Sequence, residues 1–176
     1  KDMKRLLFFI LLVAGALNSA AQTVTISPLP QKVTWGECAF ANDAQFYIVG
    51  ANMADVDAVN VLTEKLNIVG VSDKVNAKKF PQAKPVIIGD VQDKAVAKYK
   101  KLVPEAAEGY YINVSADQVV IAGRDNSGTF YGVQSFIQLM SAPKVMQCEI
   151  SDYPSVTERG VIEGFYGNPW SHADRL

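Results

Sequence analysis

Two glycines and two aromatic residues stand together near the end of the sequence, in the stretch Gly164-Phe-Tyr-Gly167. The β-branched pair Val161-Ile162 before this stretch is typical of a buried strand. Pro169 lacks the N–H that a strand ladder needs, and Ser171 can cap a helix. The segment therefore predicts a strand, a glycine-aromatic loop and a helix start, the arrangement in which α/β enzymes place ligand sites.

The residues of this loop have a chemical use beside a sugar. Gly164 lets the backbone approach a ligand because it has no side chain. Phe165, Tyr166 and Trp170 offer aromatic faces that suit the apolar faces of pyranose rings, and packing at the mouth of a sheet explains them equally well. His172, the single histidine, stands in a first helical turn whose dipole disfavours its charged form, which favours a structural role.

Three carboxylates flank the loop, namely Asp152, Glu158 and Glu163. Paired carboxylates do acid–base work in glycosidases, but no spacing here indicates that two of these face each other. Glu163 is the best placed, at the end of the predicted strand, and it is equally consistent with a structural partner for Arg159. We therefore assign no catalytic residue within the 176 residues.

The composition narrows the classes of partner. Apolar residues make up 49% of the chain and charged residues 20%, which is typical of a globular protein. The net charge of −1, without a block of like charges, argues against nucleic acid or a membrane surface as partner. One histidine and the distant Cys38 and Cys148 give no zinc spacing, so we expect no metal and no other cofactor. Whether the two cysteines form a disulfide stays open.

The first residues are typical of an export signal. Lys4 and Arg5 precede an apolar run from Leu6 to Leu17, and Ser19-Ala20-Ala21 supplies the small residues that a signal peptidase needs. We expect residues 1–21 to be a signal peptide, Gln22 to begin the mature chain, and the protein to be periplasmic or secreted. An uncleaved anchor is the alternative, and the run is short for a membrane span.

The middle of the chain predicts an α/β or α+β domain in which helices pack on a mixed sheet. Apolar residues at three- and four-residue steps indicate helices, and short β-branched runs indicate strands. The expected strands cover 45–49, 85–89, 109–114 and 118–122, and the expected helices cover 55–69, 93–102 and 129–140. Residues 28–35 are interpreted as an extended lead-in segment, and a domain boundary is expected near 152–155, where proline and polar residues cluster.

A glycine-containing loop, from Gly123 to Gly128, deserves comparison with phosphate-binding loops. No lysine follows Gly128, so the loop does not match the P-loop pattern, and it does not match Gly-x-Gly-x-x-Gly either. We interpret it as a turn with Gly128 close to the start of a helix.

Two stretches resemble known families. The stretch from Arg159 to His172 resembles the opening of the catalytic barrel in family 84 glycoside hydrolases, the β-N-acetylglucosaminidases that include O-GlcNAcases and enzymes named hyaluronidases. The stretch from Gly123 to Leu139 is similar to the amino-terminal domain shared with family 20 hexosaminidases. The resemblance implies an accessory domain over residues 22–153 and the truncated start of a (β/α)8 barrel over 154–176.

The same resemblance implies a hydrolase that retains configuration and acts on glycans or glycopeptides with terminal N-acetylglucosamine. In that family the 2-acetamido oxygen of the substrate attacks the anomeric carbon, assisted by two adjacent aspartates. No Asp-Asp occurs here, so we expect the pair beyond residue 176. Motif match makes Gly164, with Phe165 and Tyr166, the substrate-binding residues. The alternatives are a non-catalytic carbohydrate-binding module and a family 20 hexosaminidase, which would carry Asp-Glu.

Overall fold

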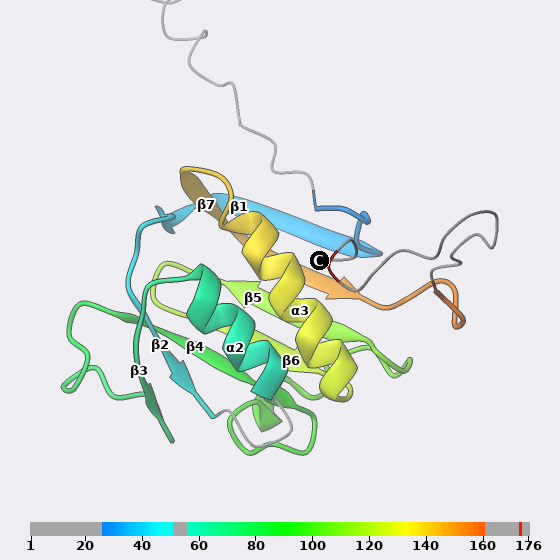
Figure 1. Ribbon diagram of the computed structural model, residues 1–176, viewed down its shortest axis with the longest axis horizontal. Helices are drawn as coiled ribbons and strands as arrows, with labels where there is room; N and C mark the ends of the chain where they lie inside the picture. Colours follow the sequence, from blue (N-terminus) through cyan, green and yellow to red (C-terminus); the bar gives the residue numbers. More distant parts are fainter. Residues whose placement is uncertain (1–25, 51–55, 161–172, 174–176) are drawn as a thin grey trace, which may run out of the picture.

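The computed structural model describes residues 26–50, 56–160 and Ala173. These residues form a seven-stranded mixed sheet in the order β1-β7-β5-β6-β4-β2-β3 (Figure 1). The predicted architecture, helices packed on a mixed sheet, is confirmed. The strands are β1 (Lys32–Ala41), β2 (Phe46–Val49), β3 (Ile68–Ser72), β4 (Lys84–Asp90), β5 (Tyr110–Val114), β6 (Val119–Gly123) and β7 (Lys144–Asp152).

Strand direction divides the sheet into two halves. β2 pairs in parallel with β3 and β4, and β4 pairs in parallel with β6. β5 pairs antiparallel with β6 and β7, and β1 pairs antiparallel with β7. The β5–β6 pair is the predicted hairpin, closed by the Ser115 N–H, which donates to the Gln118 carbonyl at 3.0 Å. This half of the sheet carries the chain to its exit at the end of β7.

Two α-helices, α2 (Val56–Lys65) and α3 (Asn126–Leu139), lie side by side on one face of the sheet (Figure 1). α3 buries Val133 and Phe136 completely, and α2 buries Leu62. The Phe136 ring meets the Phe46 ring of β2 edge-on, with the centroids 6.1 Å apart. These contacts close the main core, as the helical periodicity predicts. Neither helix, within the described ranges, is long and apolar enough to cross a membrane.

The opposite face is covered by irregular chain. Phe80 stacks on Tyr47 with ring centroids 4.4 Å apart, and Tyr99 stacks on Tyr111 at 6.1 Å. The helix expected over 93–102 is therefore wrong: the segment holds only a three-residue 3₁₀ turn, η2 (Ala97–Tyr99). Its backbone makes i→i+3 hydrogen bonds, such as Tyr99 N–H to Val96 O at 2.8 Å. The need to place Tyr99 on the sheet overrides the helical propensity of the lysine-rich sequence.

One further expectation fails at an edge of the sheet. The helix expected over 55–69 ends at Lys65, and the chain continues into β3, so Gly70 lies in a strand and does not stop the helix. The β-branched residues Ile68 and Val71 pair with β2 in this edge strand. The lead-in segment over 28–35 runs into β1, and β7 was not expected. β1 is mostly exposed, so it lacks the alternation that marks a half-buried strand.

Candidate functional site

The predicted sugar-binding residues Gly164, Phe165 and Tyr166 lie outside the described residues, as do Glu163, Trp170 and His172. The structure does describe the segment that leads toward them. That segment runs from Asp152, the last residue of β7, to Gly160, and it includes Glu158 and Arg159.

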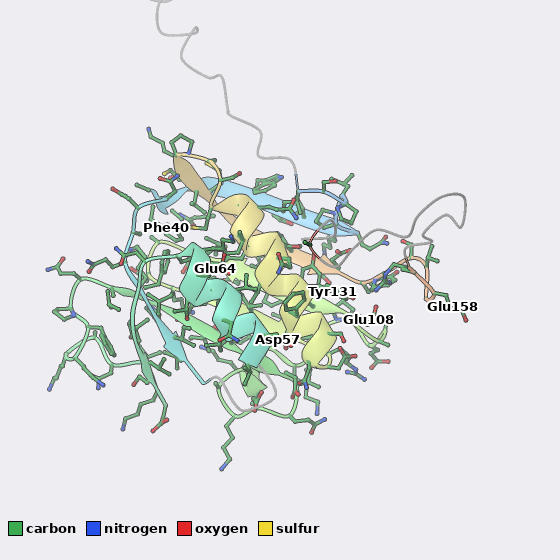
Figure 2. The ribbon with its side chains drawn as sticks, viewed as in Figure 1. Phe40, Asp57, Glu64, Glu108, Tyr131 and Glu158 are labelled. Atoms are coloured by element: carbon green, nitrogen blue, oxygen red, sulfur yellow. The ribbon has the colours of Figure 1, made fainter. Side chains whose placement is uncertain are left out.

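A cavity of ≈ 510 Å³ opens beside this segment. Its walls come from residues 27–29 and 31, from residues 108 and 110, from one side of α3 and from residues 152–156 and 159. Figure 2 shows Tyr131 and Glu108 on the side of the domain where the chain leaves toward Glu158. We call this region the exit corner and define it by Glu108, Tyr110, Tyr131, Ser135, Asp152 and Arg159, all of which line the cavity.

A chain of hydrogen bonds, buried at Ser135 and exposed at Gln31, lines the cavity. Tyr110 Oη donates to Asp152 Oδ2 at 2.8 Å, and it lies 2.7 Å from Ser135 Oγ. Because the phenol has a single hydrogen, which it donates to Asp152, Ser135 is the donor in its hydrogen bond with Tyr110. The other carboxylate oxygen, Asp152 Oδ1, accepts the Gln31 N–H at 3.0 Å. Asp152 thus ties β5, β7 and the segment before β1 together.

The protonation of Tyr110 follows from its position. Burial raises the pKa of the Tyr110 phenol far above its ordinary value, the hydrogen bond from Ser135 opposes the shift, and the Asp152 carboxylate adds to it. Tyr110 therefore remains a neutral donor at any physiological pH. Each Asp152 oxygen accepts one hydrogen bond from within the domain, so this carboxylate has a structural role in holding the corner together.

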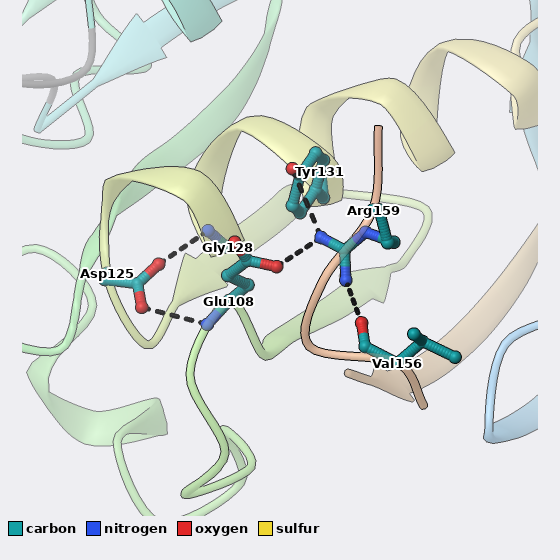
Figure 3. A network of polar contacts seen from close by, with 6 residues as sticks. All are labelled: Glu108, Asp125, Gly128, Tyr131, Val156 and Arg159. Carbon is teal, nitrogen blue, oxygen red and sulfur yellow. Dashed lines mark hydrogen bonds and ion pairs between the residues drawn. The ribbon is translucent and has the colours of Figure 1, made fainter. Parts of the chain in front are cut away.

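Arg159 is held at the rim by contacts with Glu108, Tyr131 and Val156 (Figure 3). Its guanidinium makes an ion pair with Glu108, donates to the Val156 carbonyl at 2.7 Å and to Tyr131 Oη at 3.4 Å. The guanidinium carbon also lies 5.6 Å from the centre of the Tyr131 ring, a cation–π arrangement. The hydrogen bond to Glu108, and then that to Tyr131, raise the pKa of Arg159 above its ordinary value. The structure pairs Arg159 with Glu108; the partner expected from the sequence, Glu163, lies outside the described residues.

Glu108 is itself positioned by the start of α3. Asp125, the N-cap of α3, accepts the Gly128 N–H through Oδ1 at 2.8 Å and the Glu108 N–H through Oδ2 at 2.9 Å (Figure 3). Glu108 has a φ of 60°, a left-handed conformation that non-glycine residues adopt rarely. A Cβ at Gly128 would lie 2.2 Å from the Gly109 carbonyl oxygen, so only glycine permits this close contact. Gly128, in the loop that was compared with phosphate-binding loops, is therefore required by packing.

The acidic, histidine and cysteine side chains of the described residues form no metal-binding cluster, and the two cysteines are free thiols. No group of three His, Cys, Asp or Glu side chains in those residues could hold a metal ion. Cys38 is an exposed free thiol and Cys148 a buried one. They lie on neighbouring strands but out of register, since Cys38 pairs with Met146 and Cys148 with Trp35. Burial, and then the nearby Glu149 carboxylate, raise the pKa of Cys148 to about 12. Cys148 is therefore a structural thiol.

Sequence reasoning did not identify Glu108, Tyr131 and Gln31 as neighbours of the exit segment. Glu108 lies 51 residues and Tyr131 lies 28 residues from Arg159 in the sequence. Gln31 lies 121 residues from Asp152. The pairing of β5 with β7, which sets Tyr110 opposite Asp152, is the signal that could have located this corner. The sequence did not predict β7, so this pairing could not be predicted either.

The comparisons with known proteins divide the chain at this corner. The sequence model of glycosyl hydrolase family 20, domain 2, matches residues 23–153. The chain belongs to this family. A second sequence model, described as beta-N-acetylglucosaminidase, matches residues 159–176 and so begins at the anchored Arg159. A family 20 domain 2 is thus followed, in one chain, by a segment similar to a glucosaminidase.

Solved structures contain similar domains. The structure of CpGH84D is similar at a TM-score of 0.70 with 22% identity, over 88% of this chain and 28% of that chain. The structure of CpGH84B is similar at 0.66 with 28% identity, over 87% of this chain and 26% of that chain. A beta-N-acetylhexosaminidase from Bacteroides fragilis NCTC 9343 gives 0.53, 19% identity and shares of 76% and 26%. The family 20 domain 2 chain therefore spans about a quarter of the length of the structures it matches.

Proposed function

We propose that this chain is the amino-terminal part of an exported β-N-acetylglucosaminidase that removes terminal β-linked N-acetylglucosamine from glycans or glycopeptides. The observation that carries the proposal is the succession of two matches: a family 20 domain 2 over residues 23–153, then a glucosaminidase segment over 159–176. The similarity to CpGH84D and CpGH84B supports the same domain architecture.

The mechanism we propose is substrate-assisted. The acetamido oxygen of the substrate attacks the anomeric carbon, one aspartate orients the acetamide, and its neighbour acts as acid and then as base. We place this aspartate pair beyond residue 176. Gly164 brings its backbone close to the bound sugar, and Phe165 and Tyr166 flank it.

The experiment compares the 176-residue chain with the longer chain that continues through the barrel. The longer chain should hydrolyse an aryl N-acetyl-β-glucosaminide, and the 176-residue chain should not. In the longer chain, Gly164→Val should lower both inhibitor affinity and turnover, because it removes ground-state contacts. Val161→Ala is the control, and it should act mainly on stability. An inactive longer chain that is correctly folded would exclude the proposed function.

A family 20 β-hexosaminidase is the second candidate, favoured by the family to which residues 23–153 belong. The two candidates differ in the catalytic pair, which is Asp-Asp in the first and Asp-Glu in the second. The Glu163-Gly-Phe-Tyr-Gly167 loop supports the first. The sequence of the strands that follow residue 176 decides between them.

Export is part of the proposal. Signal peptidase should cut after Ala21, and the secreted product should begin at Gln22. Mass spectrometry of the exported protein measures this directly. A product that still carries the Leu6–Leu17 run would argue for an anchor.

A further inference from the structure

Seven exposed lysines lie on the irregular chain that covers the sheet face opposite the helices. Both covering segments, one after β3 and one after β4, pack on the same apolar cluster of the sheet, through Phe80 on Tyr47 and Tyr99 on Tyr111. The fold therefore gathers lysines from two segments over one face of the domain. We call it the lysine face and define it by Lys74, Lys78, Lys79, Lys94, Lys98, Lys100 and Lys101.

The region of the lysine face is positive although the chain as a whole is not. Residues 73–101 hold eight lysines and three aspartates, a net charge of +5, whereas the other described residues hold five basic and eleven acidic side chains, a net charge of −6. The eighth lysine, Lys84, donates to the Ala116 carbonyl at 2.6 Å and is not part of the lysine face. The chain's net charge of −1 argued against a membrane surface as partner, but it conceals this separation of charge, because acidic residues elsewhere compensate for the lysines.

The lysines of this face are not neutralised within the domain. Both ion pairs between described residues lie elsewhere, on α2 and at the exit corner. Lys79 Nζ lies 5.0 Å from the centre of the Phe80 ring, and Lys98 Nζ lies 4.8 Å from the centre of the Tyr99 ring. These cation–π contacts position two ammonium groups beside rings that are themselves stacked on the sheet, and they leave the positive charge unpaired. The lysine face is therefore available to an anionic partner.

Two exposed apolar side chains accompany the lysines and indicate the kind of anionic partner. Val75, which follows Lys74, is 53% exposed, and Leu102, which follows Lys101, is 50% exposed. A soluble acidic polymer offers such side chains no apolar medium. At a bilayer surface they leave water while neighbouring lysines contact the headgroups, the combination by which proteins bind the membrane interface. The two features together favour a bilayer with anionic headgroups.

We propose that the lysine face is a membrane-docking surface. The domain lies on a bilayer that contains anionic phospholipids, with the lysines at the phosphate groups and with Val75 and Leu102 in the headgroup region. Helices α2 and α3, on the opposite face of the sheet, then face away from the bilayer (Figure 1). Because exposed charges are screened by salt, this association is reversible and weakens at high ionic strength. The proposal does not depend on the proposed activity, since docking requires no hydrolysis.

The test measures co-sedimentation with lipid vesicles. It uses the longer chain beginning at Gln22, so that the Leu6–Leu17 run is absent. One set of vesicles contains phosphatidylcholine alone, and the other contains about one third phosphatidylglycerol, both at about 0.1 M salt. We expect binding to the anionic vesicles only, with its loss at about 1 M salt.

Matched charge variants locate the binding surface. Lys98→Gln combined with Lys101→Gln should lower the affinity for anionic vesicles at least about fivefold. Lys32→Gln combined with Lys144→Gln makes the same change in net charge on β1 and β7, and it should change the affinity less than about twofold. All four sites are exposed, so the melting temperature should stay within about 2 °C in both double variants. Equal losses from the two double variants would overturn the proposal.

Leu102→Gln distinguishes a bilayer from a soluble polyanion. It should lower the affinity for anionic vesicles at least about threefold and leave retention on a heparin column unchanged, because only the bilayer takes up the apolar side chain. Retention on heparin without binding to vesicles would assign the face to an acidic glycan and overturn the proposal. Equal binding to anionic and neutral vesicles would overturn it as well, since the lysines would then have no role. A longer chain that docks but does not hydrolyse would reject the proposed activity alone.

Discussion

The helix-covered core and the exit corner are held together by different kinds of contact. In the core, Phe46, Ile112, Phe136 and Ile150 are completely buried, and each packs against several apolar neighbours. In the exit corner, single directional contacts join residues that are far apart in sequence, and the Arg159 and Glu108 side chains remain 40% and 33% exposed. Burial of apolar surface is non-directional and additive, whereas one ion pair at a surface contributes little to stability.

This difference separates two tasks. The core makes the domain fold, and many substitutions there cost stability. The exit corner decides the direction in which the chain leaves the domain, and substitutions at its partly exposed ion pair, Glu108 and Arg159, should change local access more than global stability. The following predictions test that separation, beginning with the largest effect.

Phe136→Ala should destabilise the domain most. The ring is completely buried and packs edge-on against Phe46, so its loss leaves a cavity and should cost about 3–5 kcal/mol in urea unfolding. Phe130 on the same helix is only partly buried, and Phe130→Ala is the control with a smaller expected loss. Equal losses from the two variants would mean that the buried position has no special weight.

Alkaline pH should destabilise the domain through three buried acids. Burial raises the pKa of Tyr110, and it raises the pKa of Tyr111 and of Cys148 to about 12 in each case. A raised folded-state pKa gives stability that is complete below the unfolded value and is lost as pH rises above it. The unfolded values are 10.0 for tyrosine and 9.0 for cysteine. The urea midpoint should therefore fall from pH 9 upward, and Cys148→Ala should delay the fall. A midpoint that stays constant to pH 11 would contradict this.

Tyr110→Phe should cost about 1–3 kcal/mol, because Ser135 and one oxygen of Asp152 lose a buried partner. Tyr131→Phe is the matched control in the same corner, since the Tyr131 hydroxyl makes only a 3.4 Å contact with Arg159, and its effect should stay within about 0.5 kcal/mol. Chemical unfolding of the 176-residue chain measures both. An unchanged free energy of unfolding in Tyr110→Phe would show that the hydrogen bonds of Tyr110 do not stabilise the exit corner.

Glu108→Gln should have the smallest effect on stability and a clear effect on local access. Trypsin must draw the Arg159 side chain into its specificity pocket, and the ion pair with Glu108 competes with this. Cleavage after Arg159 should become faster in Glu108→Gln, relative to cleavage at Lys78 and Lys79 in the same digest. Glu64→Gln removes the exposed ion pair with Lys65 on α2 and is the control. Unchanged cleavage after Arg159 would show that the ion pair with Glu108 does not hold the Arg159 side chain in place.

The core was predictable from the sequence because its signal is local and repeated. Val133, Phe136 and Met140 recur at helical spacing, and the structure buries all three. The β5–β6 hairpin was equally readable, since a short polar turn separates two β-branched runs. Errors arose where tertiary contacts decide: Tyr99 stacks on Tyr111 in place of the expected helix over 93–102.

The exit corner was not predictable, because its contacts leave no local, repeated signal in the sequence. No periodicity links Glu108 to Arg159, or Gln31 to Asp152, because each contact joins one residue to one distant residue. The left-handed conformation of Glu108 has no composition signal, since it depends on the Asp125 carboxylate that accepts its N–H. The glycine-aromatic loop over 164–167 was noticed through its residue types, and its role as a sugar site stays a prediction.

The most direct test of the proposed glucosaminidase compares two substrates on the longer chain. An aryl N-acetyl-β-glucosaminide carries the acetamide that acts as nucleophile, whereas the matching aryl β-glucoside carries only a hydroxyl at that position. We expect kcat/KM to be at least about 1,000-fold higher for the first, because an intramolecular nucleophile held in place accounts for much of the rate. Similar values of kcat/KM for the two substrates would contradict the account.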